Sequence, residues 1–387
     1  MIDPHRFSAF SLASKAIHGY APADTLYRSV ACPIYQTSTF VNPALGSDIR
    51  YSYSRCDNPT RTCLEDTIAL LEGGRAGFAF SSGLAAVLAV FSLLKSGDHV
   101  IVSDDVYGGT YRQINELWKH LGIAFDAVDI GNTGDVRAHV LPNTRLIYAE
   151  TPTNPMMKVA DIAALADIAH QNGALLAIDN TFLTPLFQRP LSLGADIVLH
   201  SATKYLSGHN DLLAGCVISK DPDVAARLRT IYKTTGAVLS VFDSWLLLRS
   251  LKTLPVRMKQ HQENALYLAQ WLEEQPIVEK VLYPGLPQHP GYAIQKKQAS
   301  GFGGMISFYV KKEAYVKTIL QSIRLIQFAE SLGGTESLLT YPITQADLTP
   351  EEAEEKGITH TLLRFSVGLE DKEDLRDDLA QAFHQCK

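Results

Sequence analysis

The chain has 387 residues, of which 46% are hydrophobic and 20% are charged, and its formal net charge is -6. These proportions are typical of a globular protein, and the negative net charge gives no reason to expect nucleic acid or a membrane as a partner. Small molecules are therefore the expected ligands.

The five cysteines are odd in number and form no CxxC pair, so neither a disulfide framework nor a metal site is expected. This cysteine usage favours a reducing, cytoplasmic location. The opening MIDPHRFSAF does not read as a secretion signal, and the most apolar stretch, residues 78–94, is interrupted by serines and a glycine. Secretion and membrane spanning are not expected.

The first 55 residues contain turn signals and little periodicity, which predicts an N-terminal arm that contacts a neighbouring subunit. From about residue 76, short apolar runs alternate with segments of helical period. The predicted strands are GFAF (77–80), HVIVS (99–103), RLIYAE (145–150), ALLAID (174–179), ADIVLH (195–200) and LLAGCVIS (212–219), and the predicted helices cover 83–97, 107–122 and 161–173. This order predicts a large, doubly wound, mostly parallel α/β domain over residues 56–245.

Beyond about residue 240 the pattern changes to two long helices, at 242–254 and 256–274. Apolar runs at 303–310 and 361–367 and a final helix follow. The sequence therefore predicts a smaller α+β domain over residues 246–387. In open α/β sheets, ligands bind at the carboxyl ends of the strands, so the residues after each apolar run are the candidates for a site.

Two of these strand ends suit a phosphorylated ring. Ser82 and Gly83 precede a helix, whose N-terminal N–H groups suit a phosphate, although Ser and Gly also serve as helix caps. Tyr107 stands beside two glycines, where its ring could lie flat against a planar ligand, and a structural tyrosine is the alternative.

The next strand ends carry an amide and a carboxylate. Prolines hold the backbone around Asn154, which is left as a positioned hydrogen-bonding group. Asp179 ends an apolar strand, with no lysine or arginine nearer in sequence than Arg189. A carboxylate there would keep a pyridine nitrogen protonated, and the alternative is an Asp-Asn turn.

Lys204 follows the predicted strand ADIVLH (195–200) and stands among the hydroxyls of Ser201, Thr203 and Ser207, which can hydrogen-bond a phosphate. A desolvated lysine is a good nucleophile for an imine, whereas a solvated surface lysine is the alternative. Together the strand ends match the needs of pyridoxal phosphate (PLP). The sequence has no GxGxxG after a strand, no GxxxxGK[ST] and no HExxH, which disfavours nucleotide and zincin sites.

The chain resembles the PLP enzymes of cystathionine and methionine metabolism, which include cystathionine γ-synthase, cystathionine γ-lyase, cystathionine β-lyase and methionine γ-lyase. The resemblance is carried by PIYQTSTF, YSYSRCDNPTR, SSGLAA, DDVYGGTYR, ETPTNP, IDNTF, HSATKYLSGHND, ESLGG and LLRFSVGLE, which cover nearly the whole chain. It implies a fold-type I PLP enzyme that assembles as a homotetramer of two catalytic dimers.

The resemblance also implies roles for individual residues. Lys204 would be the lysine that forms the imine with PLP, Asp179 the partner of the pyridine nitrogen, and Tyr107 the stacking ring and a second acid/base. The implied phosphate ligands are Ser82, Gly83, Leu84, Ser201 and Thr203, with Tyr53 and Arg55 from the neighbouring subunit. Asn154 would lie near the phenolic oxygen, Arg364 would bind the substrate α-carboxylate, and Ser331 would hold the lysine and substrate.

Three positions depart from the family's common pattern. Leu84 stands where methionine is frequent, which we expect to be harmless. Residues 341–348, YPITQADL, lack the histidine of the MTHA pattern, so specificity is in question. Gly109 stands where methionine γ-lyases carry cysteine, which disfavours that activity.

The resemblance implies an enzyme that makes or breaks the C–S bond of cystathionine. The motifs favour cystathionine γ-synthase, followed by the γ-lyase, the β-lyase and an O-acylhomoserine sulfhydrylase. Glu330 matches a position that is acidic in γ-synthases and γ-lyases, where it would receive a distal ammonium group. A catalytically silent PLP carrier and a nucleotide-binding α/β protein are the alternatives from other classes.

Overall fold

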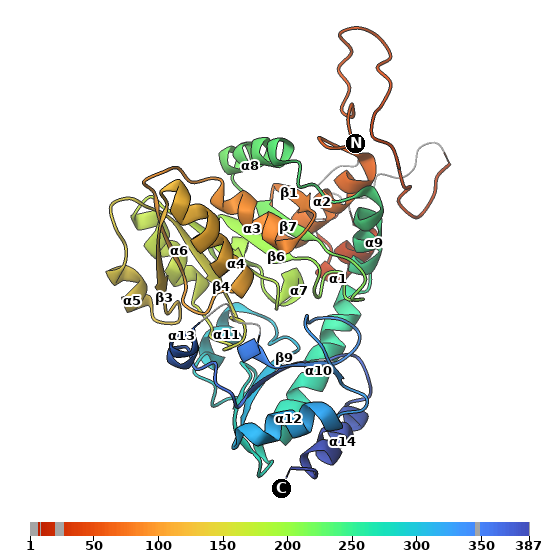
Figure 1. Cartoon of the computed structure of the whole chain (residues 1–387). Coiled ribbons are helices and arrows are strands. Elements are labelled where there is room, and N and C mark those ends of the chain that lie inside the picture. The colour runs from red at the N-terminus through yellow and green to blue at the C-terminus, as the bar shows by residue number, and fades with distance from the viewer. Residues whose placement is uncertain (1–6, 8, 20–26, 345–348, 387) are drawn as a thin grey trace.

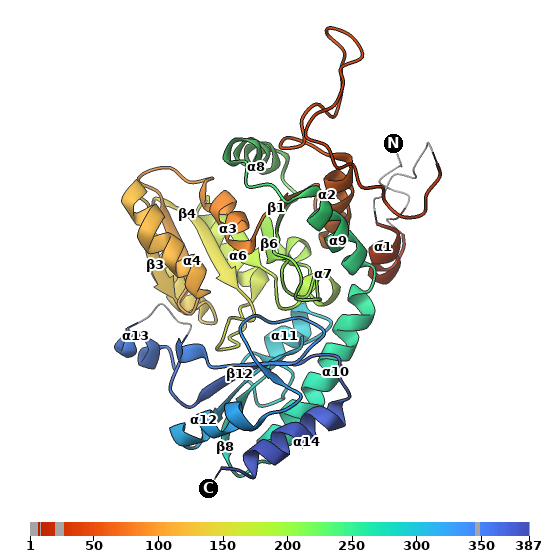
Figure 2. The ribbon, with the colours of Figure 1, turned by 45° about the vertical axis from the view of Figure 1, so that its right-hand side comes forward.

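The chain is built around two β-sheets that are joined by a long helix (Figure 1). The computed structural model describes residues 7, 9–19, 27–344 and 349–386. Figures 1 and 2 both place the larger sheet in the upper part of the molecule and the smaller sheet below it, with α10 (Leu254–Glu273) running from one to the other. No helix in the described part of the chain is long and apolar enough to cross a membrane.

The larger sheet has seven strands in the order β1-β7-β6-β5-β4-β2-β3. Its strands are β1 (Ala76–Phe80), β2 (His99–Ser103), β3 (Ala124–Val128), β4 (Thr144–Glu150), β5 (Leu175–Asp179), β6 (Ile197–Ser201) and β7 (Gly215–Ser219). Strands β2 to β6 pair in parallel, whereas β7 is antiparallel to both of its neighbours. The predicted mostly parallel sheet is confirmed.

Helices cover both faces of this sheet. One face packs against α3 (Gly83–Phe91), α4 (Gly108–Gln113) with the π-helix that follows it (Ile114–Trp118), and α8 (Pro222–Thr235). The other face packs against α2 (Pro59–Glu72), α5 (Thr133–Ala138), α6 (Ile162–Gln171) and α9 (Val241–Leu251). Short helices α1 (Leu12–His18) and α7 (Thr184–Phe187) complete this half of the molecule.

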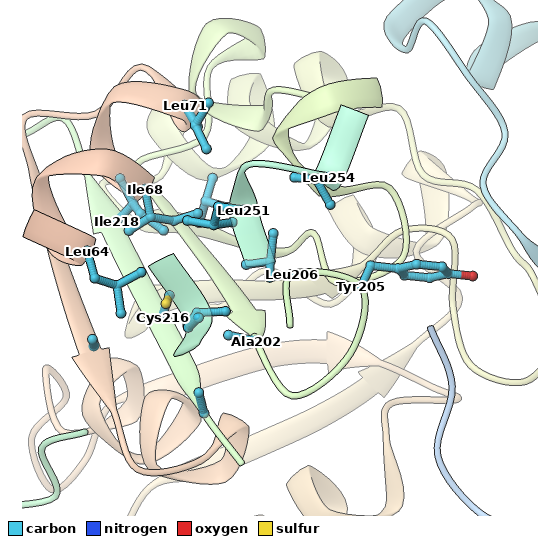
Figure 3. Packing of buried hydrophobic residues seen from close by; sticks show 14 of the residues in the cluster. Leu64, Ile68, Leu71, Ala202, Tyr205, Leu206, Cys216, Ile218, Leu251 and Leu254 are labelled. Atoms are coloured by element: carbon cyan, nitrogen blue, oxygen red, sulfur yellow. The ribbon is translucent and has the colours of Figure 1, made fainter. Parts of the chain in front are cut away.

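The sheet is buried on both sides because the middle residues of its strands are apolar on both faces. Every residue of β2 and β7 is buried, and so is every residue of β4 except Arg145. Figure 3 shows part of the packing behind β6 and β7, where Leu64 and Ile68 of α2 and Leu251 of α9 meet Cys216 and Ile218. These contacts fix the strands from which the site residues project.

The smaller sheet has five strands in the order β10-β11-β12-β9-β8. They are β8 (Val278–Leu282), β9 (Met305–Val310), β10 (Gln327–Phe328), β11 (Leu338–Thr340) and β12 (Leu362–Ser366), and they pack with α10, α12 (Glu313–Ser322) and α14 (Lys372–Phe383). The helices α11 (Tyr292–Gln298) and α13 (Pro350–Glu355) lie in its connections. Strand β12 carries Arg364 toward the larger sheet.

The structure differs from the sequence-based expectation in several elements. The predicted helix 83–97 ends at Phe91, and the predicted helix 107–122 divides into α4, the π-helix and a 3-10 turn at Lys119–Leu121. The edge strand β3 was not predicted, because it is mostly exposed and carries Asp126 among its apolar residues. The predicted domain boundary at residue 245 falls inside α9. This helix lies after the last strand of the larger sheet and before the first strand of the smaller one.

Residues 27–55 extend away from both sheets as a long loop (Figure 1). Its two legs are tied to each other by hydrogen bonds such as that from the Phe40 N–H to the Ser52 carbonyl, at 3.0 Å. Large apolar side chains are exposed along it, including Val30, Val41 and Leu45. Such exposure is unusual for a monomer and is typical of a surface that another chain covers.

A buried arginine holds the turn that carries Lys204. Arg257 of α10 is 4% exposed, and its guanidinium donates to the carbonyl oxygens of Tyr205 at 2.7 Å, Leu206 at 3.4 Å and Ser250 at 3.0 Å. The backbone approaches so closely that a Cβ at Gly208, where φ is +69°, would lie 2.2 Å from Arg257 Nη1. Arg257 therefore links α10 to the turn after β6.

Replacing Arg257 with leucine should destabilise the protein, because three backbone carbonyls lose their donor while they stay buried. We expect the free energy of unfolding to fall by about 3 kcal/mol, the cost of one to a few unsatisfied buried polar groups. Urea unfolding followed by circular dichroism measures this change. The control is Lys259→Leu at an exposed position of the same helix; equal stability of the two variants would contradict the role given to Arg257.

Candidate active site

A cavity of about 660 Å³ lies at the carboxyl end of the larger sheet and extends toward the smaller one. All the residues that the sequence singled out for the cofactor and substrate line it, except Tyr53, Arg55 and Ser207. Those that line it are Ser82, Gly83, Leu84, Tyr107, Asn154, Asp179, Ser201, Thr203, Lys204, Glu330, Ser331 and Arg364. The larger sheet supplies the first nine, and the smaller sheet with its connections supplies the last three.

Lys204 lies just after β6, and its Nζ donates to Ser331 Oγ at 2.9 Å. Burial lowers the pKa of Lys204 to about 8, with the Arg364 cation acting in the same direction and the Glu330 carboxylate opposing both. Ser331 has a φ of 89°, in the left-handed region that a residue with a side chain seldom adopts. The Lys204 amine is thus held by a hydrogen bond to Ser331, a residue whose own backbone conformation is strained.

Arg364 is 6% exposed, and its guanidinium donates to Asn154 Oδ1 at 2.8 Å and to the Ser331 carbonyl at 2.9 Å. Its Nε is buried without a partner, and no described carboxylate forms an ion pair with it. Burial lowers the pKa of Arg364 to about 10. A buried guanidinium that lacks an anion is suited to bind a carboxylate from outside the chain.

Asp179 ends β5 and is partly buried. Its Oδ1 accepts the N–H of Thr181 at 3.0 Å and the Thr181 hydroxyl, and its Oδ2 accepts the Tyr148 hydroxyl at 3.4 Å. Burial raises the pKa of Asp179, whereas the Thr181 hydrogen bonds and the nearby His200 lower it. The Asp179 carboxylate therefore stabilises the turn that follows β5. The same turn orients this carboxylate in the cavity.

The expected phosphate end is formed where α3 begins beside Ser201. A Cβ at Gly83 would lie 2.8 Å from Ser201 Oγ, so only glycine permits this approach. The first N–H groups of α3 have no carbonyl of the helix to receive them, which leaves them available to an anion. Serine 82 is also the N-cap of α3, since its hydroxyl accepts the Ala85 N–H at 3.1 Å.

Two further hydroxyls of this stretch have partners within the protein. Thr203 Oγ1 accepts the Ala214 N–H at 2.9 Å and donates to the Ala214 carbonyl. Ser207 is fully buried and donates to the Thr203 carbonyl at 2.9 Å, and it does not line the cavity. The interpretation of Ser207 as a phosphate ligand was therefore wrong, because its side chain supports the turn from behind.

Tyr107 directly precedes α4 and its ring is 51% exposed at the cavity. A Cβ at Gly109 would lie 2.6 Å from Cε1 of Tyr107 and 3.0 Å from Cδ2 of Leu84. A cysteine at position 109 would therefore require one of these side chains to move. Residues Gln345 to Leu348, part of the stretch that lacks the MTHA histidine, lie outside the described residues.

Tyr53 and Arg55 do not reach the cavity of their own chain. They lie at the base of the loop of residues 27–55, where Arg55 Cζ is 5.6 Å from the centre of the Tyr53 ring and its Nη1 donates to the Lys233 carbonyl. Within one chain they have no place in the site.

Sequence reasoning missed two cavity residues that contact the predicted ones. Thr181 orients Asp179, and Glu150 accepts the Tyr107 N–H at Oε1 at 2.9 Å. Glu150 ends an apolar run and Thr181 lies shortly after another. Both could therefore have been found among the residues at the carboxyl ends of the predicted strands. Among the described residues, no group of three His, Cys, Asp or Glu side chains is placed to hold a metal ion.

The cavity fits PLP on the evidence of its own chemistry. The glycine-lined approach at Gly83 and Ser201 suits a phosphate, Asp179 suits a pyridine nitrogen, and the Tyr107 ring suits the face of the heterocycle. Lys204 would hold the cofactor covalently. Bound PLP would supply an acceptor for the electron pair that is left when a proton leaves the α-carbon of an amino acid.

The lowered pKa of Lys204 can be measured on the enzyme freed of PLP. Trace acetylation over a pH series, followed by peptide mass spectrometry, should give half-maximal reactivity at Nζ near pH 8. Glu330→Gln should move this midpoint to lower pH, because the carboxylate that favours the ammonium form is removed. A midpoint near 10.4, the value of a free lysine, would contradict the environment described for Nζ.

Known proteins of similar sequence match nearly the whole chain. Cystathionine gamma-lyase of Bacillus subtilis (strain 168) is 49% identical over 368 residues, which are 95% of this chain and 97% of that protein. A cystathionine beta-lyase of Lactococcus lactis subsp. cremoris (strain MG1363) is 48% identical over 377 residues, 97% of this chain and 99% of that protein. A Bacillus subtilis (strain 168) protein named cystathionine gamma-synthase/O-acetylhomoserine (thiol)-lyase is 48% identical over 367 residues, 94% of each chain.

The solved structure of cystathionine gamma-lyase from Lactobacillus plantarum complexed with L-serine superposes with a TM-score of 0.95 at 43% identity. The match covers 97% of this chain and 99% of that one, and it confirms the predicted fold type I. The family model of the Cys/Met metabolism PLP-dependent enzymes matches residues 13–384. Since this match spans nearly the whole chain, the protein belongs to that family of enzymes, and its cofactor is PLP.

Proposed function

We propose that this enzyme makes or breaks the C–S bond of cystathionine, and that its principal reaction is that of a cystathionine γ-synthase, which joins an O-acylhomoserine to cysteine. The observation that supports the proposal is the placement of charge around Lys204. The unpaired Arg364 guanidinium lies deep in the cavity, and the exposed Glu330 carboxylate stands at its edge. A substrate with a carboxylate at one end and an ammonium at the other complements this pair.

Within the proposal, Arg364 binds the α-carboxylate of the substrate. The Lys204 amine, whose pKa of about 8 leaves a larger neutral fraction than an exposed lysine has, takes the α-proton and returns a proton farther along the chain of the substrate. Ser331 Oγ keeps that amine in place through its 2.9 Å hydrogen bond. Tyr107 stacks on the cofactor ring, Asp179 keeps the ring nitrogen protonated, and Asn154 lies at the phenolic oxygen.

The phosphate is proposed to bind at Ser82, Gly83, Leu84, Ser201 and Thr203. Of these, Ser201 and the first N–H groups of α3 are the strongest candidates, because the hydroxyls of Ser82 and Thr203 already accept backbone N–H groups. A hydroxyl that accepts one such bond keeps its own proton to donate. The Ser82 hydroxyl can therefore still donate to a phosphate oxygen, whereas the Thr203 hydroxyl would first have to give up its bond to the Ala214 carbonyl.

The reaction itself is tested by product analysis on the purified enzyme with PLP. An O-acylhomoserine with cysteine should yield cystathionine, identified by mass spectrometry. Cystathionine offered alone separates the alternatives: cysteine with 2-oxobutyrate would indicate a γ-lyase, and homocysteine with pyruvate would indicate a β-lyase. Dominance of either cleavage over synthesis would contradict the proposed principal reaction.

Glu330 provides a separate test of how the distal ammonium is recognised. Glu330→Gln should weaken the use of cysteine or cystathionine by one to two powers of ten, the equivalent of a charge-assisted hydrogen bond of about 1.5–3 kcal/mol. Turnover of O-acylhomoserine alone, which has no distal ammonium, should change little. The control is Glu336→Gln at an exposed position outside the cavity; equal losses on both kinds of substrate would remove Glu330 from recognition.

We further propose a homotetramer of two catalytic dimers in which Tyr53 and Arg55 reach the cofactor phosphate of the neighbouring subunit. Support comes from the exposed apolar side chains of residues 27–55, and from the cavity lining, to which this loop of the same chain contributes no residue. A shared site of this kind makes the dimer obligatory for activity.

Subunit mixing tests this arrangement. Arg55→Ala and Lys204→Ala chains should each be inactive as homodimers, whereas a heterodimer rebuilds one intact site from the Lys204 of one chain and the Arg55 of the other. Activity should therefore appear after subunit exchange. If heterodimers form, as native mass spectrometry would show, and activity stays absent, the sites are not shared.

A further inference from the structure

Glu150 is a buried cavity residue to which the proposed chemistry gives no task. It ends β4, it is 6% exposed, and it lies directly beside Asp179 in the register of the parallel strands β4 and β5. Its side chain lines the cavity. A carboxyl group in this place is costly to bury, so its contacts should explain why the chain keeps it.

Those contacts are with the backbone on both flanks of the expected cofactor ring. Oε1 of Glu150 accepts the N–H of Tyr107 at 2.9 Å, at the residue where α4 begins without a side-chain cap. The backbone N–H of Asn154 is also directed at this carboxyl group. One side chain thus ties the backbone of the proposed stacking residue to that of the residue beside Arg364.

The surroundings of Glu150 disfavour a negative charge on it. Burial raises the pKa of Glu150 well above its usual range, and the neighbouring Asp179 and Asp105 carboxyls act in the same direction. The hydrogen bonds from the Tyr107 and Asn154 N–H groups lower this pKa, but they do not outweigh burial and the two carboxyls. No described Lys, Arg or His forms an ion pair with it. Asp179 receives the Thr181 N–H, the Thr181 hydroxyl and the Tyr148 hydroxyl, so of the two neighbours Asp179 is the better place for the charge.

We propose that Glu150 is a positioning residue which, as a neutral carboxyl group, holds the Tyr107 backbone against the cofactor and leaves the negative charge to Asp179. The inference rests on the proposed stacking of Tyr107 and not on the choice of substrate. A carbonyl oxygen is all that the Tyr107 N–H requires, so an amide in this position should serve equally well.

The test compares Glu150→Gln, which keeps the acceptor, with Glu150→Leu, which removes it. PLP is titrated into each protein after removal of the cofactor, and the dissociation constant is measured by the visible absorbance of bound PLP. Circular dichroism in the same band reports the orientation of the ring in the site. Glu65→Gln and Glu65→Leu are matched controls, because Glu65 is 4% exposed, accepts the Ala79 N–H at 3.0 Å and lies outside the cavity.

Glu150→Gln should bind PLP as the unaltered protein does, with the same circular dichroism band. Glu150→Leu should bind PLP about tenfold more weakly, with a reduced band, the effect of losing one or two hydrogen bonds to the backbone. The Glu65 variants should keep the affinity and the band even where their unfolding midpoint falls. Far-UV circular dichroism verifies folding, and Glu150→Met replaces Glu150→Leu if the latter does not fold.

Two outcomes would overturn the proposal. If Glu150→Gln is as impaired as Glu150→Leu, the site needs an ionised carboxylate at this position. If both bind PLP normally, Glu150 does not position Tyr107. Neither outcome depends on turnover of cystathionine, so an error in the proposed reaction would be recognised separately.

Discussion

Two cations share one buried cavity in this protein, and much of the site follows from that constraint. The Lys204 amine and the Arg364 guanidinium are both desolvated, and the Arg364 charge further disfavours the ammonium form of Lys204. An arginine stays protonated under such conditions, whereas a lysine loses its proton more readily. The result is an amine with an increased neutral fraction next to a permanent positive charge, which is the combination that an amino-acid substrate requires.

The two sheets supply different residues of this cavity. Lys204 and Asp179 come from the carboxyl ends of the larger sheet, while β12 and the segment at Ser331 bring the guanidinium and the acceptor for the amine from the smaller half. The hydrogen bond from Arg364 to Asn154 joins the two halves at the cavity. A change that moves one half relative to the other would therefore alter the protonation of Lys204 as well as the binding of the carboxylate.

Acidic groups complete the electrostatic balance without cancelling the cations. Glu330 stands at the exposed edge, where it partly restores the pKa of Lys204, and Asp179 lies inside the cavity. Glu150 also lines the cavity, Asp105 lies near Glu150, and burial raises the pKa of all three carboxyl groups. The hydrogen bonds to Asp179 are what distinguish it from its neighbours.

Much of the fold and site was predictable because apolar strands buried on both faces leave a strong signal, and ligand-binding residues follow them directly. Lys204 and Asp179 were found in this way, and the motifs of the family added Arg364 and Ser331. The edge strand β3 escaped detection because Asp126 interrupts its short apolar run, and Ser207 was misjudged because sequence spacing does not tell which way a hydroxyl points in a turn. Glu150 was overlooked because, as the last residue of its strand, it was counted with the core.

The central claim is that the chemistry of the enzyme depends on the amine of Lys204. The most direct measurement is reduction of the PLP-loaded enzyme with sodium borohydride, followed by digestion and peptide mass spectrometry. The account predicts that the pyridoxyl group is found on Lys204 and that Lys204→Ala acquires none. Stable attachment to any other lysine, or an unmodified Lys204 in a fully loaded enzyme, would contradict it.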